Sequence, residues 1–475
     1  MVNTTHRSKW LIFLLVAIAQ FMVVLDNAIT NIALPSIKTE LGFSTDSLQW
    51  VITAYALAFG GFLLLGGRAA DLFGRKKVLL GGMIAFALAS FLIGISQNAL
   101  QLISLRAFQG LAGAFMSPAA LSIVLVTFRD GTARNKALSY WTLVSTGGAA
   151  AGLLIGGILT QYVGWRWNFF INVPIGIIMA ILIARYTPSH EQEERRQTLD
   201  MPGALLVTSG LMLFAFGLSQ APVWGWTAWQ TIATIVASLG LLGAFVYNES
   251  RVAHPLVPLG LFKNRNIVGA NLVMAPLYAA MLGTFFLATL FIQSVLHYSP
   301  ALTGLAFLPM PLTLALMSTQ MPRLVGRYGY RRFMIIGPLI TAFGLLWLST
   351  LSASSTYVAG LLLALFILPV GIGMTMMPTI AAATSGVPGH QSGLASGVVN
   401  TSQQMGGALG LAILSGVLAT VTAQYASQGQ LVATLHGSQW AFYAAGIFTV
   451  AAALAAITIV RSYRHQAAGV VAMSE

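Results

Sequence analysis

The sequence predicts an all-α membrane protein with fourteen transmembrane helices, arranged as two six-helix bundles with two further helices inserted between them. Three observations lead to this fold class. Hydrophobic residues make up 57% of the 475 residues and charged residues only 7%, against about 25% in soluble domains. Apolar segments of about 20 residues, long enough to cross a hydrocarbon core of roughly 30 Å, recur along the chain. Short sequence matches also relate the first part of the chain to the last part.

The apolar segments define the expected spans. They cover residues 10–34, 47–67, 78–97, 101–126, 138–160, 168–186, 202–220, 229–247, 267–293, 302–321, 333–351, 356–380, 395–421 and 439–460. We expect the first segment to be a membrane span and not a cleaved signal peptide. It extends well beyond an apolar region of about 7–15 residues, and no clear small-residue cleavage site follows it.

The positions of the basic residues test this count, because Lys and Arg concentrate in cytoplasmic loops. With both termini and every even-numbered connection inside, 21 of the 24 Lys and Arg residues lie on the cytoplasmic side. Only Lys38 and Arg166 fall outside, and Arg106 falls within a span. The net charge of +13 therefore indicates topology and not a nucleic-acid partner. We expect a multi-pass protein of the cell (plasma or inner) membrane, surrounded by the lipid bilayer, with both termini cytoplasmic.

Two weak internal matches share one offset. "LGFSTDSL" from Leu41 aligns with "LHYSPALT" from Leu296, and "RAADLFGRKK" from Arg68 aligns with "RLVGRYGYRR" from Arg323, both 255 residues apart. The expected domains are therefore a six-helix bundle in residues 1–198, two inserted helices in 199–250 and a second six-helix bundle in 251–475. Parallel six-helix repeats are typical of transporters whose site lies at the midplane between the halves.

Two ionisable residues fall within the hydrocarbon. Asp26 lies 17 residues beyond Lys9, hence roughly 25 Å along a helix that leaves the cytoplasm. Arg106 lies 8 residues beyond Asn98, hence roughly 12 Å in from the outer face on a helix running the other way. The two side chains therefore lie at comparable depth. Each alone would cost about 2.5–3.5 kcal/mol to insert, and a shared cavity with water or with each other reduces that cost.

Two interpretations of this pair stay open at the sequence level. The first is a fixed ion pair that only clamps the first and fourth spans together. The second is a protonatable switch, because burial disfavours the Asp26 carboxylate whereas a nearby Arg106 guanidinium favours it. Embedded acids usually mark ion or proton pathways. At the repeat offset the second bundle has Met281 and Leu361, so any coupling chemistry is expected in the first bundle.

The loop "GRAADLFGRKK" predicts a cytoplasmic gate. Gly67 and Gly74 allow a tight turn and a close helix contact. Asp71 can cap a helix or pair with nearby basic residues, which would hold the gate shut in one state. The alternative is a plain positive-inside loop, but an acid in such a loop has no topological purpose.

Two further spans carry patterned residues. Gly148, Gly152 and Gly156 share one face of the fifth span, where small residues let helices approach closely. Ordinary packing and a gating role are both open for this face. Span thirteen carries a polar stripe that would face a central cavity. The expected substrate contacts are Asn31, Tyr55 and Gln404, while Asn400 and Gln403 complete that stripe.

Other functional classes find little support. The chain has no Cys, so neither a disulfide nor a thiolate metal site is expected. Its seven His residues are scattered over loops and termini without ligand spacing. We therefore expect no metal, no cofactor and no enzymatic activity. Nothing in the sequence resembles the selectivity filter or charge ring of a channel.

Five motifs, in order along nearly the whole chain, resemble the major facilitator superfamily, and in particular its fourteen-helix drug:proton antiporters. They are "LDNAITNIALP" from Leu25, "GRAADLFGRKK" from Gly67, "LISLRAFQGLAGA" from Leu102, "WRWNFFINVPIG" from Trp165 and "HPLVPLGLFKNR" from His254. The resemblance implies that Asp26 carries the coupling proton and that Arg106 assists its transfer. It places Asp71 and Arg75 in the gate. It also assigns four glycines to the antiporter motif of the fifth helix, namely Gly148, Gly152, Gly156 and Gly157, with Leu153 where that motif normally has proline.

The function expected from residues and resemblance together is a proton-coupled antiporter. It would export amphipathic or hydrophobic small molecules by alternating access, as a multidrug efflux protein, and act as a monomer. The alternative on the same fold is an exporter of a lipid or of an endogenous metabolite, such as an antibiotic made by the host.

Overall fold

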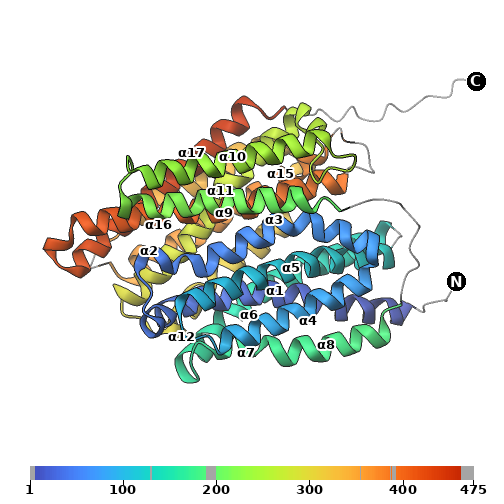
Figure 1. Cartoon of the computed structure of the whole chain (residues 1–475), viewed down its shortest axis with the longest axis horizontal. Helices are drawn as coiled ribbons and strands as arrows, with labels where there is room; N and C mark the ends of the chain where they lie inside the picture. Colours follow the sequence, from blue (N-terminus) through green and yellow to red (C-terminus); the bar gives the residue numbers. More distant parts are fainter. Residues whose placement is uncertain are drawn as a thin grey trace, which may run out of the picture.

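A computed structural model describes residues 6–128, 131–188, 199–352, 355–385, 387 and 392–461, and helices form nearly all of this part of the chain (Figure 1). Fourteen of these helices are long and apolar enough to cross a membrane, which confirms the predicted number of spans. No strand occurs in the described ranges.

Most of the long helices extend beyond the predicted apolar segments at one or both ends. The long helices are α1 (His6–Leu41), α3 (Trp50–Phe73), α4 (Arg75–Gly94), α5 (Ala99–Thr127), α6 (Gly131–Tyr162), α8 (Asn172–Tyr186), α9 (Met201–Trp224), α10 (Trp229–Arg251), α11 (Arg265–Ser294), α13 (Pro309–Tyr328), α14 (Tyr330–Leu348), α15 (Leu363–Thr384), α16 (Ser392–Gln424) and α17 (Gln430–Thr458). Of these, α4, α14 and α17 end two or three residues before the predicted limit. The short helices α7 (Trp167–Phe170) and α12 (Pro300–Ala306) and a π-helical turn (Tyr357–Leu362) lead into α8, α13 and α15 and belong to the same spans.

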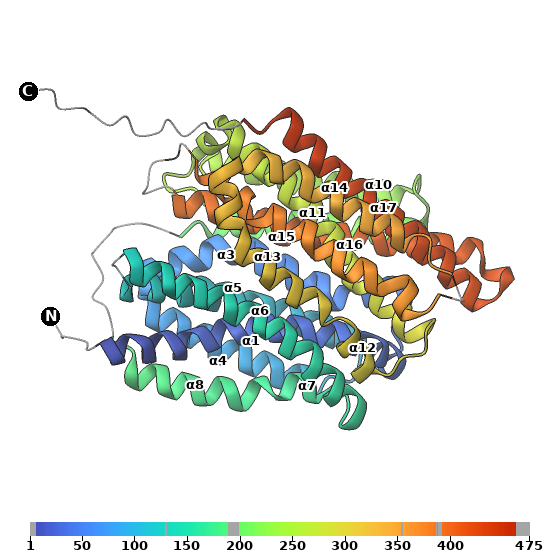
Figure 2. The same ribbon diagram turned by 180° about the vertical axis from the view of Figure 1, so that it is seen from behind.

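The helices group into two bundles that lie side by side (Figures 1 and 2). Helices α1 to α8 form the first half and α11 to α17 form the second half. Helix α9 contacts α3 of the first half, α16 of the second half, and α10. Helix α1 begins and α17 ends at one end of the molecule, called here the termini end; α6 ends and α12 lies at the opposite, far end.

The same local geometry recurs at the repeat offset. Gly74, between α3 and α4, has φ +97°, and Gly329, between α13 and α14, has φ +78°. A residue without Cβ adopts this left-handed backbone at no steric penalty, which explains glycine at both turns. Ser44 and Ser299 each accept a hydrogen bond at 3.3 Å from the backbone N–H three residues later and so cap the helices that follow.

Burial differs sharply between α3 and α10. Most of the apolar stretch of α3 is buried inside the protein, whereas only 11% of the apolar stretch of α10 is buried. In a membrane-spanning chain an exposed apolar helix faces lipid, since lipid tails are as apolar as its side chains. Helix α3 therefore belongs to the interior around the central cavity, and α10 to the lipid-facing surface.

The two halves contact each other closely at the far end. Gly157 of α6 lies so near α12 that an added Cβ would be 2.6 Å from the Pro300 carbonyl oxygen. Conversely, a Cβ on Gly304 of α12 would overlap the Leu153 carbonyl oxygen. The Gln161 side-chain oxygen accepts a hydrogen bond from the Ala301 backbone N–H at 3.2 Å. The far end is thus closed by backbone-to-backbone packing.

Candidate functional site

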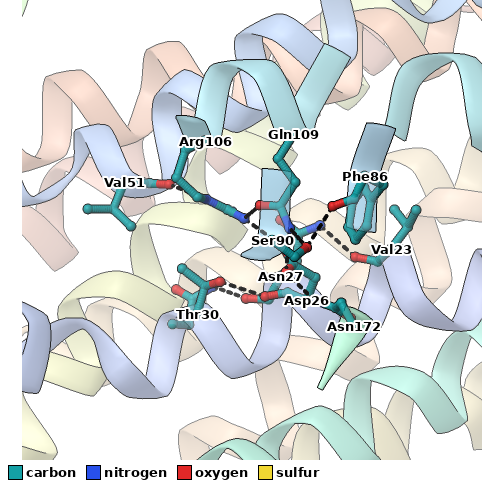
Figure 3. A network of polar contacts seen from close by, with 11 residues as sticks. Val23, Asp26, Asn27, Thr30, Val51, Phe86, Ser90, Arg106, Gln109 and Asn172 are labelled. Atoms are coloured by element: carbon teal, nitrogen blue, oxygen red, sulfur yellow. Dashed lines mark hydrogen bonds and ion pairs between the residues drawn. The ribbon is translucent and has the colours of Figure 1, made fainter. Parts of the chain in front are cut away.

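Asp26 lies in the middle of α1 and is completely buried. Its carboxylate points into the first half, where three side chains surround it (Figure 3). Arg106 Nη1 lies 2.6 Å from Oδ2, and Gln109 Nε2 and Asn172 Nδ2 donate to Oδ1 at 2.8 and 2.9 Å. Charge-assisted hydrogen bonds of this kind are short and strong, so the ionised carboxylate is well compensated despite its burial.

Arg106 is equally buried and is held from several sides. Its Nε donates to the Val51 carbonyl oxygen at 2.9 Å, and its Nη1 also donates to the side-chain oxygen of Gln109. The guanidinium carbon lies 4.3 Å from the centre of the Tyr55 ring, a cation–π distance. Nη2 has no hydrogen-bond partner within the described part of the chain. The two N–H groups of this nitrogen therefore have no acceptor among the described residues.

The network contains residues that sequence reasoning missed. Gln109 connects both charges and donates a further hydrogen bond to Ser90 Oγ at 2.8 Å, and Asn172 comes from the start of α8. Gln109 follows Arg106 by three residues, which places both on one helix face. Both amides stand inside motifs already quoted. Their polarity within apolar spans was the signal that could have found them.

A cavity of about 300 Å³ lies between the two halves. The first half lines it mainly with α1 residues and the second half with residues of α11, α13, α15 and α16. Its polar lining consists of Gln20, Asn27, Asn31, Ser117, Tyr278, Asn400, Gln403 and Gln404. Its apolar lining includes Phe59, Met281, Phe285, Met310 and Leu314. The space therefore has amides on both halves and an apolar surface between them.

The three expected substrate contacts divide into two groups. Asn31 and Gln404 line the cavity. Tyr55 is buried behind the wall, with its ring between Arg106 and Phe59; the two aromatic rings stack at 5.9 Å. Because Phe59 faces the cavity, two stacked rings, those of Tyr55 and Phe59, lie between Arg106 and the cavity space. Tyr55 therefore contacts Arg106 on one side and the cavity-lining Phe59 on the other, and is not itself among the residues that line the cavity.

The glycines of α6 face two different partners. Gly148, Gly152 and Gly156 face α1 within the same half; an added Cβ on Gly152 would lie 2.6 Å from the Ala28 Cβ, and one on Gly156 2.7 Å from the Ile29 Cα. Gly157 faces α12 of the other half. The three glycines therefore form a seam on α1 beside Asp26, and the fourth belongs to the far-end contact.

The expected gate residues lie at the termini end. Asp71, the single acid of α3, accepts a hydrogen bond from Arg75 at the start of α4 at 3.0 Å; the Asp71 side chain is exposed, whereas that of Arg75 is only partly exposed. Gly74 makes the turn between them with its positive φ, and Gly67 lies near Pro118 of α5. In this conformation Asp71 pairs within its own segment.

A second polar cluster joins the inserted helices to the first half. Asp200 and Glu249, at the termini ends of α9 and α10, are both buried. Asn248 donates to both Asp200 oxygens at 3.0 Å, and Glu249 Oε2 accepts the Val257 backbone N–H at 2.8 Å. Arg68 of α3 donates to the His254 carbonyl oxygen at 2.7 Å. These contacts attach α10 to α9 and to its own following loop, and that loop to α3.

The fold and the site together define a class of protein: a polytopic membrane protein with two helical halves around a central cavity and one buried ion pair in the first half. The model of the Major Facilitator Superfamily matches residues 16–411. The chain belongs to this superfamily, and it is a membrane transporter.

Curated relatives are similar over most of their length. The chain is 40% identical to the puromycin resistance protein pur8 of Streptomyces alboniger, covering 95% of this chain and 91% of that protein. It is 39% identical to the cephamycin export protein CmcT of Amycolatopsis lactamdurans, covering 83% and 82%. It is 32% identical to a tetracenomycin C resistance and export protein of Streptomyces glaucescens, covering 86% and 76%.

Solved structures share the fold at low sequence identity. The POT family transporter PepTSo superposes with a TM-score of 0.69 at 17% identity, covering 95% of this chain and 97% of that one. The xylose transporter XylE from E. coli, in an inward open conformation, gives a TM-score of 0.63 at 14% identity, covering 96% and 98%.

Proposed function

We propose that this chain is a proton-driven antiporter that exports small amphipathic molecules from the cytoplasm by alternating access. One observation carries the proposal: a fully buried pair, Asp26 and Arg106, lies directly behind the wall of a cavity that both halves line. The distribution of basic residues supports a cytoplasmic termini end. A cavity completed by a single chain supports a functional monomer.

Protonation of Asp26 would change how α1 is held. The ionised carboxylate accepts hydrogen bonds from Arg106, Gln109 and Asn172. A proton on Oδ2 removes the negative charge and replaces the strongest acceptor by a donor. Arg106 would still bond to the Val51 carbonyl oxygen and stack on Tyr55. The proton therefore weakens the attachment of α1 to α5 while leaving Arg106 partnered.

A movement of α1 would reach the far end through its contacts with α6. The glycine seam of α6 contacts the Phe21 to Ile29 part of α1, which includes Asp26. The next residue after that seam, Gly157, contacts α12 of the second half. Close-packed helices move as rigid elements between discrete arrangements. Occupancy of the proton site can thus bias whether the far end is closed.

In the proposed cycle, Asp26 takes a proton from outside while substrate leaves, and releases it to the cytoplasm before new substrate binds. Each ligand drives the change only through its different affinity for the two conformations. The competing interpretation is a fixed clamp in which the pair never changes protonation.

Transport in proteoliposomes with an imposed pH gradient tests the proposal. We expect substrate movement to follow the gradient in the original protein and to lose that dependence in Asp26→Asn, while exchange of substrate for substrate continues. Glu40→Gln is the matched control, because it removes a carboxylate from the partly exposed far end. Gradient-driven efflux by Asp26→Asn would leave the fixed clamp as the better account.

A second candidate keeps the mechanism and changes the cargo to an antibiotic made by the host. It is favoured by the relatives pur8 and CmcT, whose names refer to resistance to or export of antibiotics. A drug-susceptibility panel in a deletion strain, read together with the neighbouring genes, separates the two. Sensitivity to many unrelated compounds supports multidrug efflux, and sensitivity to a single one supports self-resistance.

A further inference from the structure

The wall of the central cavity carries no charged side chain among the described residues that line it. The one acid in the middle of a span, Asp26, points away from the cavity and already accepts three hydrogen bonds. Arg106 lies behind Tyr55 and Phe59. A charged ligand group would therefore leave water without gaining a counter-charge, which is strongly unfavourable.

The α1 wall presents hydrogen-bond acceptors. Asn27 Nδ2 donates to the Val23 carbonyl oxygen and Asn31 Nδ2 to the Asn27 carbonyl oxygen, both at 2.9 Å within the same helix. Only the amide nitrogen can donate to a carbonyl, so these bonds fix which end of each amide is which. Each amide nitrogen is thus bonded to the helix backbone, and the Asn31 oxygen has no hydrogen-bond partner among the described residues.

Asn31 provides the most specific observation. Its side chain is 6% exposed, and its Oδ1 is buried without a hydrogen-bond partner in the described part of the chain. The residue nevertheless lines the cavity. A buried acceptor left unpaired costs about 1–3 kcal/mol. A ligand N–H or O–H group placed beside Asn31 would remove that penalty.

The second half contributes the complementary surface. Asn400, Gln403 and Gln404 of α16 add amides that can both donate and accept. Met281 and Phe285 of α11 form part of the apolar surface between the two amide walls. Unbranched methionine side chains repack around different shapes. The cavity therefore combines fixed acceptors on α1 with adaptable groups on the second half.

We propose that the cavity selects uncharged amphipathic molecules that place an N–H or O–H donor on Asn31 Oδ1 and an apolar body against Met281 and Phe285. Permanently charged organic cations are poor ligands of this cavity. This inference rests on the proposed export function and specifies its substrate class. At about 300 Å³, the cavity is at the small end of the range for drug-sized ligands.

Three coumarin probes of similar size test the inference. One carries a secondary amide N–H, the second has that amide N-methylated, and the third carries a permanent trimethylammonium group. In proteoliposomes we expect the secondary amide to be transported with kcat/KM at least tenfold above either of the others. Equal or faster transport of the ammonium probe by the original protein would overturn the inference.

Two substitutions at Asn31 separate the roles of charge and hydrogen bonding. Asn31→Leu removes the acceptor, so the preference for the secondary amide over its N-methylated form should disappear. Asn31→Asp adds a carboxylate to the cavity and should raise transport of the ammonium probe at least tenfold. Asn98→Asp adds the same charge at the exposed N-cap of α5, where Asp caps as well as Asn, and should change neither ratio.

A second variant keeps the inference testable if substitutions at the buried Asn31 prevent folding. Gln404→Glu places a carboxylate on the opposite wall of the same cavity and should also admit the ammonium probe. Persistence of the N–H preference in a folded Asn31→Leu variant contradicts the donor assignment. A carboxylate at position 31 or 404 that leaves ammonium transport unchanged contradicts the charge argument.

Equilibrium binding to the purified protein distinguishes failure of this inference from failure of the proposed function. If the secondary amide binds preferentially but is not moved by a pH gradient, the antiport mechanism is wrong and the ligand class stands. If gradient-driven transport occurs without preference among the three probes, antiport stands and the ligand class is wrong.

Discussion

The two halves of the molecule repeat one another in backbone but not in chemistry. In the first half, α1 and α5 contribute Asp26 and Arg106 to a buried polar network. The positions at the repeat offset in the second half are Met281, on the cavity wall, and Leu361, which is fully buried. The first half thus carries the groups whose charge can change, and the second half offers a repackable apolar wall. Repetition of the fold supplies symmetry-related helices, and the difference in side chains confines the proposed proton site to the first half.

The largest expected effect comes from leaving one charge of the first half unpaired. Arg106→Leu strands the Asp26 carboxylate in the interior, and loss of one partner of a buried pair costs about 3–5 kcal/mol. We expect a large drop in thermal stability in detergent, partly restored by adding Asp26→Asn. The comparison substitution, Met281→Leu in the second half, is expected to cost less than about 1.5 kcal/mol.

Equal destabilisation by Arg106→Leu and Met281→Leu would contradict this expectation. It would mean that the buried ion pair of the first half contributes no more to stability than the apolar wall of the second half. A double variant no more stable than Arg106→Leu alone would show that Asp26 does not depend on Arg106.

Substitutions at two neighbouring glycines of α6 distinguish the contact inside the first half from the contact between the halves. Gly156→Ala places a Cβ 2.7 Å from the Ile29 Cα inside the seam, and overpacking of this kind costs about 1–3 kcal/mol. Gly157→Ala places a Cβ 2.6 Å from the Pro300 carbonyl oxygen of the other half. We expect Gly156→Ala to lower the melting temperature and Gly157→Ala chiefly to open the far end.

Spin labels report the second effect. The chain has no native Cys, so labelled cysteines at the exposed positions Tyr162 and Leu302 measure the separation of α6 and α12 at the far end. We expect this distance to increase in Gly157→Ala and to stay unchanged in Gly156→Ala. An increase in Gly156→Ala and no change in Gly157→Ala would contradict the assignment of Gly157 to the contact between the halves.

The smallest effect on stability is expected at the termini end. Asp71 is exposed and its partner Arg75 is partly exposed, and ion pairs in contact with water contribute about 0–1 kcal/mol. Asp71→Asn should therefore leave the melting temperature nearly unchanged. If Asp71 acts in a gate, the same variant lowers the transport rate in proteoliposomes while unfolding stays unaltered. An unchanged transport rate would indicate that the loop between α3 and α4 is a plain positive-inside loop and that Asp71 does not act in a gate.

Much of the fold and part of the site could be predicted from the sequence, and each success has an identifiable cause. Membrane thickness fixes helix length, so apolar segments reveal the number of spans. Depth arithmetic along the first and fourth spans placed Asp26 and Arg106 at one level, and the structure pairs them at 2.6 Å. The expectation that Tyr55 contacts substrate found no support in the cavity lining, since the ring lies against Arg106.

The sequence by itself determined the number of helices, the repeat offset and the identity of the two embedded charges. These follow from hydrocarbon thickness, from similarity along the chain and from the rarity of charge in a span, none of which requires knowledge of neighbours. Only the tertiary structure decided that Gln109 and Asn172 complete the network, that Asn31 Oδ1 has no partner among the described residues and that Gly157 faces the other half. Those properties depend on how each helix is rotated about its axis and on which helix lies beside it. In a chain that is apolar on nearly every side, the hydrophobic pattern does not fix that rotation.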